Sequence, residues 1–113
     1  MMDREELLRE IKTRLSAAYG ERLKGVVLYG SEARGEARED SDYDFLVLLE
    51  GPVNFAKELR FIISIIFPIE HEIICNSEPP QDRLLDVLPV DAKVFEAGEY
   101  DLYFNAKREG IFL

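Results

Sequence analysis

The sequence predicts a mixed α/β (α+β) domain in which helices flank a small mixed β-sheet. Along the 113 residues, amphipathic stretches with apolar residues every three or four positions alternate with short runs rich in β-branched residues. Glycine or proline closes most of these runs, as expected where a chain turns. The hydrophobic share of 47% suits one compact domain over residues 1–113 with a single modest core.

The first half of the chain predicts two helices and two strands in alternation. Residues 5–19 place their apolar side chains on one helical face, which predicts an amphipathic helix. The run at 25–29 predicts a buried strand, and Ser31 is a favourable N-cap for a short helix over 31–39. The segment 42–50 predicts a second strand, which a Gly-Pro pair stops.

The second half predicts two further helices with a strand between them. Residues 54–67 carry apolar side chains at helical spacing, and Pro68 should end this helix. The run HEIICN at 71–76 predicts a third short strand. After a Pro-Pro turn, one or two helical turns are expected over 81–88, and residues 98–110 predict a last helix.

The chain is acidic, with 14 Lys and Arg against 23 Asp and Glu and a formal net charge of -9. This charge opposes binding along a nucleic-acid backbone, where basic side chains supply most of the affinity. A single nucleoside triphosphate is compatible with it, because bound divalent cations neutralise the phosphates inside a small acidic site. We therefore expect a nucleoside triphosphate or a basic protein as partner, and no long nucleic acid.

The sequence favours a cytoplasmic protein with no membrane segment. Its single cysteine, Cys75, cannot form an intrachain disulfide, which suits a reducing compartment. The longest apolar run, at 61–69, has roughly half of the ~20 residues that a membrane helix needs. The N-terminal residues are charged from Asp3 onward and lack the apolar core of a signal peptide.

One stretch joins a phosphate-binding pattern to a metal-binding pattern. A Gly-Ser pair, Gly30 and Ser31, stands ten residues before Asp42, and Asp44 follows two positions later. Side chains alternate along a strand, so the two aspartates should point to the same face. Their carboxylates would repel each other, whereas a shared divalent cation such as Mg²⁺ stabilises both ionised forms.

The Gly-Ser end of the stretch suits a phosphate. Gly30 lets the backbone come close to a phosphate, while Ser31 and the free N–H groups of the helix start donate hydrogen bonds to its oxygens. Arg34 lies one helical turn further, within reach of a phosphate or of an acceptor. Each pattern alone is usually a turn or a solvated strand end, but the two together favour a nucleotide site.

These residues resemble the GS-x10-DxD signature of the nucleotidyltransferase superfamily that includes DNA polymerase beta. The small size, the Arg34-Gly35 pair and the ending YFNAKREGIFL are similar to its minimal nucleotidyltransferase (MNT) branch. The resemblance implies a polymerase beta-like nucleotidyltransferase fold. It also implies that Gly30 and Ser31 hold the phosphates of a nucleotide, with Arg34 beside them, and that two Mg²⁺ ions bind Asp42 and Asp44.

The resemblance also implies a third catalytic carboxylate on a neighbouring strand. The segment PIEHEIICNS offers Glu70 and Glu72. If residues 71–76 form a strand, Glu72 shares a face with Ile74, and it opens an apolar triplet as the acid of the family does. We therefore expect Glu72 as the third catalytic and metal-binding residue. The alternative is a surface Glu72, in which case catalysis would be weak or absent.

The activity that the resemblance implies is Mg²⁺-dependent transfer of a nucleoside monophosphate, AMP from ATP, to a hydroxyl group. MNT domains pair with helical HEPN proteins (higher eukaryotes and prokaryotes nucleotide-binding) as antitoxin and toxin, and attach AMP to a tyrosine of the toxin. Two alternatives remain open. In the first, the chain is a binding module that neutralises a partner by contact alone. In the second, it is a small-molecule nucleotidyltransferase that works as a homodimer.

Overall fold

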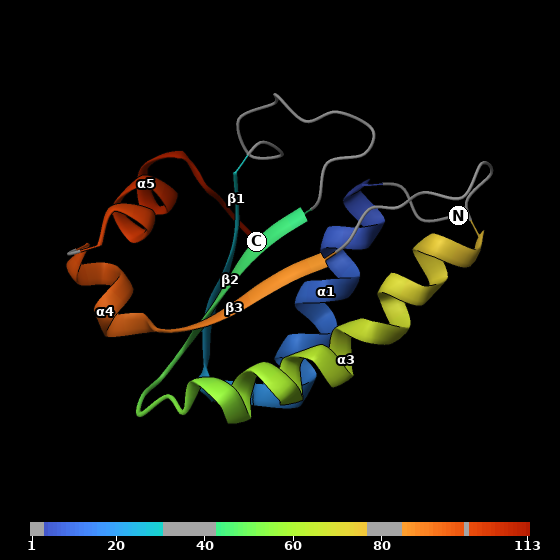
Figure 1. Cartoon of the computed structure of the whole chain (residues 1–113), viewed down its shortest axis with the longest axis horizontal. Helices are drawn as coiled ribbons and strands as arrows, with labels where there is room; N and C mark the ends of the chain where they lie inside the picture. The colour runs from blue at the N-terminus through green and yellow to red at the C-terminus, as the bar shows by residue number, and fades with distance from the viewer. Residues whose placement is uncertain (1–3, 31–42, 77–84, 99) are drawn as a thin grey trace.

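The computed structural model describes residues 4–30, 43–76, 85–98 and 100–113. A four-stranded mixed sheet with the strand order β3-β2-β1-β4 lies between two pairs of helices, α1 with α3 and α4 with α5 (Figure 1). The elements, in chain order, are α1 (Arg4–Tyr19), η1 (Gly20–Arg22), β1 (Leu23–Tyr29), β2 (Tyr43–Leu49), α3 (Phe55–Asn76), β3 (Leu85–Asp91), α4 (Ala92–Ala97), α5 (Asp101–Glu109) and β4 (Ile111–Phe112).

The sheet combines antiparallel and parallel pairs. Strand β1 runs antiparallel to both β2 and β4, whereas β2 and β3 are parallel. A parallel pair needs a long crossover, and α3 supplies it between β2 and β3. As a result, the end of β1 and the starts of β2 and β3 meet at one end of the sheet.

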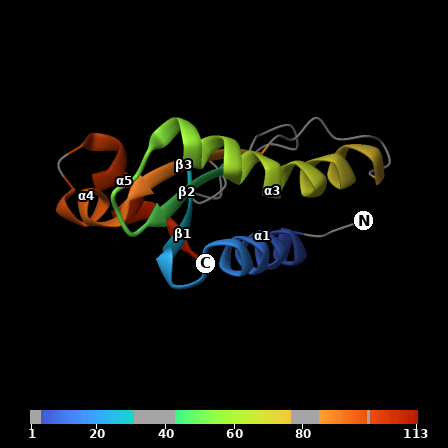
Figure 2. The same cartoon turned by 90° about the horizontal axis from the view of Figure 1, so that it is seen from below.

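Each face of the sheet buries its own apolar cluster. The larger cluster packs one face against α1 and α3, which lie together on that side (Figure 2), and it includes Ile11, Leu15, Phe45 and Ile62, each 0% exposed. The smaller cluster packs the other face against α4 and α5. Alternation along β2 produces the division, because Phe45 and Val47 belong to the larger cluster and Leu46 and Leu48 to the smaller.

Several predicted elements are confirmed. The helix expected at 5–19 is α1, the strands expected at 25–29 and 42–50 are β1 and β2, and the last helix is α5. The short helix expected over 31–39 lies outside the described residues. None of the helices in the described ranges has the length and apolar composition needed to cross a membrane.

The strand expected at 71–76 is wrong, because these residues form the last turns of α3. Pro68 does not end the helix but lies inside it. The apolar stripe explains the continuation, since Ile62, Ile66 and Ile69 are all buried at helical spacing on both sides of the proline. Burial of Ile69 offsets the hydrogen bond that Pro68 cannot donate, so the tertiary contact overrides the local helix-stop signal.

The helical turns expected over 81–88 are also wrong for the part that the structure describes, since β3 begins at Leu85. Pro89 lies within β3, which is tolerated because β3 is an edge strand and one row of its backbone groups needs no partner in the sheet. Helix α4 was not predicted. It follows β3 directly, with the Asp91 carboxylate accepting from the Lys93 N–H at 2.8 Å and Gly98 at φ 63° as its left-handed C-cap.

Candidate active site

A row of three polar side chains crosses the sheet where β1 ends and where β2 and β3 begin. Tyr29 pairs with Asp44 across β1 and β2, and Asp44 pairs with Asp86 across β2 and β3. Their neighbours Tyr43 and Leu85 are buried on the opposite face, with α1 and α3. Alternation therefore places all three polar side chains on the face that carries α4 and α5. Neighbouring strands lie about 4.8 Å apart, so the two carboxylates are adjacent.

Gly30 brings the backbone directly against one of these carboxylates. Its φ of 75° lies in the left-handed region, which glycine adopts without strain. A Cβ added to Gly30 would lie 2.7 Å from Oδ2 of Asp44. A larger residue would therefore displace the carboxylate. A ligand that binds the backbone at Gly30 would therefore lie beside the Asp44 carboxylate as well.

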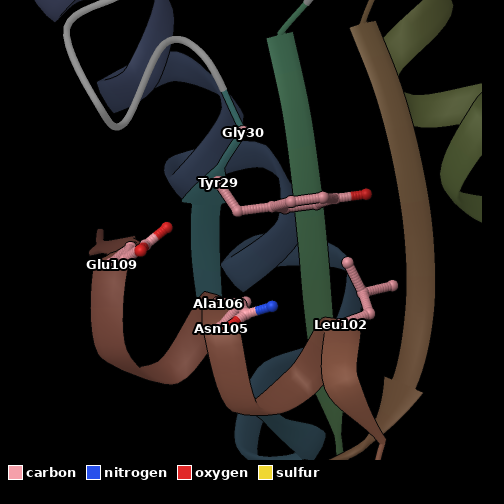
Figure 3. A pocket seen from close by; sticks show the side chains of 6 residues that line it. All are labelled: Tyr29, Gly30, Leu102, Asn105, Ala106 and Glu109. Carbon is pink, nitrogen blue, oxygen red and sulfur yellow. The ribbon is translucent and has the colours of Figure 1, made fainter.

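The pKa of Tyr29 is affected by the two carboxylates of this row. Burial is the largest cause that raises the pKa of its phenol above 10.0, and the charges of Asp44 and Asp86 raise it further. Tyr29 is therefore a neutral hydroxyl at neutral pH, able to donate a hydrogen bond. Figure 3 shows its ring extending across β2, with the hydroxyl directed toward β3.

The predicted site residues are only partly covered by the described ranges. Gly30 and Asp44 lie at the same end of the sheet and are close to each other. Ser31, Arg34 and Asp42 lie outside the described residues. The roles of all five residues stay predictions.

The choice of Glu72 rested on a strand that does not exist. Because residues 71–76 are helical, strand alternation cannot place Glu72 beside Asp44. Its alternative, Glu70, has a structural contact, since its Oε2 accepts a hydrogen bond from the N–H of Leu85 at 3.1 Å. That bond fixes the first residue of β3, next to Asp86.

Asp86 was missed because its segment was expected to be helical. A signal for it was present in the sequence, since Asp86 opens the apolar pair Val87-Leu88 and thus fits the pattern that had pointed to Glu72. The strand pairing distinguishes Asp86 from Glu72, because only Asp86 lies in the sheet. Asp86 faces Asp44 directly on the neighbouring parallel strand, and a neighbouring strand is where the resemblance implies a third carboxylate.

The pair of Asp44 and Asp86 fits a hard divalent cation. Carboxylate oxygens are the ligands that Mg²⁺ prefers, and Mg²⁺ commonly uses one or two of them together with substrate phosphates. Within the ranges that the structure describes, no set of three or more potential metal ligands is gathered at one point. Asp42, the remaining predicted ligand, belongs to the part of the chain outside those ranges.

A cavity of about 250 Å³ adjoins Tyr29 and Gly30 and extends to α5 (Figure 3). Its α5 wall consists of Leu102, Asn105, Ala106 and Glu109. The row of polar side chains therefore does not lie on a flat surface. A ligand bound at Gly30 has a recess beside it on the same face of the sheet.

Comparison with known proteins finds similar sequences. Two proteins of Methanocaldococcus jannaschii, each named "Putative protein adenylyltransferase", are similar to the chain. One is 39% identical over 85 residues, covering 75% of this chain and 81% of that protein. The other is 32% identical over 72 residues, covering 63% of this chain and 73% of that protein.

A solved structure and a family of domains complete the comparison. The structure, described as the crystal structure of a toxin-antitoxin with AMP-PNP, has the same fold with a TM-score of 0.58 at 15% identity, over 90% of this chain and 68% of that one. The family described as "Nucleotidyltransferase domain" matches residues 8–113. That match spans nearly the whole chain, and the protein therefore belongs to the nucleotidyltransferase domain family.

Proposed function

We propose that this nucleotidyltransferase moves AMP from ATP to a hydroxyl group, with Asp44 and Asp86 as its central catalytic carboxylates. The observation that carries the proposal is the register of β2 and β3, which places these two residues opposite each other beside Gly30. The names of the two similar proteins support adenylyl transfer in particular.

The order of residues across the sheet indicates where the triphosphate and the acceptor hydroxyl bind. Gly30 is at the end of β1, Asp44 is on the central β2, and Asp86 is on the edge strand β3. In-line phosphoryl transfer puts the attacking oxygen opposite the leaving group. The triphosphate therefore lies toward Gly30, with Ser31 and Arg34 as its further predicted contacts, and the acceptor hydroxyl lies toward Asp86.

The proposed step is a balanced displacement at the α-phosphorus of ATP. The bond from the acceptor oxygen to the α-phosphorus forms, the bond from the α-phosphorus to the bridging oxygen breaks, and pyrophosphate leaves. Asp86 is on the acceptor side and takes the hydroxyl proton. The neutral hydroxyl of Tyr29 donates toward the carboxylates and helps to hold their orientation.

Asp42, Asp44 and Asp86 would hold the two Mg²⁺ ions that the resemblance implies. When bound, Mg²⁺ supplies charge neutralisation for the phosphates and lowers the pKa of the acceptor hydroxyl. The residues of the chain provide the rest: Gly30 lets the backbone lie against the Asp44 carboxylate, and the strand pairing sets the spacing of the carboxylates.

We further propose a cytoplasmic antitoxin role, in which the acceptor is a tyrosine of a HEPN toxin protein. The likeness of the fold to a toxin-antitoxin structure supports this role. The net charge of -9 suits a basic protein partner.

A second candidate function is neutralisation of such a partner by contact, without transfer. Exposed apolar side chains on one helix favour it: on α3, Ile63 is 48% exposed and Phe67, one turn later, is 60% exposed.

The two candidates are separated by one experiment. The protein is mixed with Mg²⁺, a purified HEPN protein and ATP labelled at the α-phosphate, and label on the HEPN protein is measured. Transfer predicts labelled tyrosine with the wild type and none with Asp44→Asn. The ability of each variant to neutralise the toxin is measured as well. If Asp44→Asn does not label the toxin but neutralises it as completely as the wild type does, the catalytic role is refuted and the contact mechanism stands.

A further inference from the structure

The cavity beside Gly30 differs in character from the carboxylate row. One wall is the ring of Tyr29, and the other is the inner side of α5 (Figure 3). Leu102 and Ala106 supply apolar surface, while Asn105 and Glu109 supply the polar groups of α5. The recess thus combines an aromatic face, an apolar floor and an amide.

Size and charge restrict what the cavity can hold. A volume of about 250 Å³ is below the ~300–1,000 Å³ of sites for whole drug-sized ligands, so it suits one part of a nucleotide. Glu109 at its border disfavours a polyphosphate, because like charges repel. The part that fits is flat and uncharged, which describes a nucleobase.

The polar group favours one purine over the other. The Asn105 side chain offers one carbonyl acceptor and one NH₂ donor. Adenine presents a complementary pair on one edge, the N6 amino group as donor and N7 as acceptor, whereas guanine presents O6 and N7, both acceptors. The Tyr29 ring offers the face on which a base stacks.

We propose that this cavity binds the adenine base of ATP, that Tyr29 stacks on the base and that Asn105 selects adenine over guanine. The inference rests on the proposed nucleotide transfer and adds its nucleotide specificity. It gives α5, which lies about sixty residues after Asp44 in the sequence, a direct part in substrate choice. Cavity and carboxylate row share Tyr29, which joins the base site to the transfer site.

Calorimetric titration in Mg²⁺ tests the assignment with three probes: a non-hydrolysable ATP analogue, the corresponding GTP analogue and inorganic tripolyphosphate. The test variant is Asn105→Leu, which keeps the approximate volume and removes the amide. The matched control is Phe104→Leu, because Phe104 is exposed on the same helix and does not line this cavity. A second variant, Leu102→Trp, fills the cavity without changing Asn105.

We expect the wild type and the control to bind the ATP analogue about tenfold more tightly than the GTP analogue. Asn105→Leu should lose about tenfold in affinity for the ATP analogue, bring the ratio of the two affinities close to one and leave tripolyphosphate binding unchanged. Leu102→Trp should weaken both nucleotide analogues and spare tripolyphosphate.

Two results would overturn the base site while the transfer function stands. One is an Asn105→Leu variant that keeps the wild-type preference for the ATP analogue. The other is a wild type that binds tripolyphosphate as tightly as the ATP analogue. If the wild type binds none of the three probes, the proposed transfer function fails together with the base site.

Discussion

The two ends of the sheet both carry acidic residues, but the surroundings of these residues differ. At one end, η1 and the start of α3 bury Glu58, which is 4% exposed, and Arg22 lies against it with Nη1 2.5 Å from Oε2. At the other end, Asp44 and Asp86 stand opposite each other on neighbouring strands beside Gly30. The first end contains its own cation, whereas the second has the spacing that a divalent cation can bridge.

Arg22 makes the first end a structural joint. Its Nε and Nη2 donate to the carbonyls of Glu50 at 3.0 Å and Pro52 at 2.9 Å, so one guanidinium connects the start of β1 to the end of β2 and to α3. Oε2 of Glu58 has no well-aligned hydrogen-bond donor within the described residues, so its contact with Arg22 is mainly ionic. Changes at this end should affect folding, and changes at the other end should affect substrate binding.

The largest expected effect is the loss of transfer in Asp44→Asn. Removing one charge that acts in the transition state typically lowers turnover by about 100-fold or more. The measurement is label transfer from ATP to the acceptor protein, with thermal unfolding as the control. Turnover within a few-fold of wild type would contradict the assignment of Asp44.

The second effect concerns stability and belongs to the joint. Arg22→Ala leaves Glu58 buried beside an empty space, and we expect a loss of about 2–3 kcal/mol in the free energy of unfolding. This is below the ~3–5 kcal/mol for breaking a fully buried pair, because Arg22 is partly exposed. The matched control is Arg14→Ala, which removes an exposed helical pair with Glu10 and should cost less than ~0.5 kcal/mol. Urea unfolding measures both. Equal losses in the two variants would show that the pair of Arg22 and Glu58 does not stabilise the contact between the strands and α3.

A glycine comparison separates backbone strain from contact with the carboxylate. Gly30 and Gly98 both have positive φ, but a Cβ at Gly98 meets nothing within 4 Å, whereas one at Gly30 meets Asp44. Gly98→Ala should therefore cost only the backbone term of about 1 kcal/mol, and Gly30→Ala about 1 kcal/mol more. In an Asp44→Ala background the excess cost at Gly30 should vanish. If the excess persists there, Asp44 is not its cause.

The smallest expected effect is at Tyr19, near the joint. Its hydroxyl is buried with no hydrogen-bond partner in the described part of the chain, and burial and then Glu58 raise its pKa to about 12. Tyr19→Phe removes that hydroxyl and should leave the free energy of unfolding at pH 7 unchanged or raise it by less than ~1 kcal/mol.

The pH dependence gives Tyr19 a clearer signature. Its pKa in the folded protein exceeds the ordinary value of 10.0, so the folded state keeps a proton that the unfolded state releases. Its contribution to stability is complete below pH 10 and is lost as the pH rises toward about 12. Urea unfolding between these values should show a smaller alkaline loss for Tyr19→Phe. Identical pH profiles would contradict the raised pKa.

The sequence was sufficient where local pattern and tertiary packing agree. The helix α1 and the strands β1 and β2 were predicted, because the apolar residues of each segment follow a single period. It was insufficient from Pro68 to the end of α4 at Ala97. There the buried stripe through Ile66 and Ile69 outweighed a proline, and pairing with β2 outweighed the helical appearance of the segment around Leu85.

Asp86, which we propose as the third carboxylate, was not predicted for the same reason. Glu72 and Asp86 both precede apolar residues, and local sequence does not decide which of them joins the sheet. The register of β3 against β2 decides it, and register depends on contacts between residues about forty positions apart. The cavity beside α5 could not be predicted either, because it forms only where α5 packs near the end of β1.

The central claim is that Asp86, and not Glu72, completes the site with Asp44. The most direct measurement is calorimetric titration of a non-hydrolysable ATP analogue, with and without Mg²⁺, on Asp86→Asn and Glu72→Gln. We predict that Asp86→Asn loses Mg²⁺-dependent binding, by about 10-fold or more, and that Glu72→Gln binds like the wild type. The reverse result, wild-type binding in Asp86→Asn and loss in Glu72→Gln, would contradict the account.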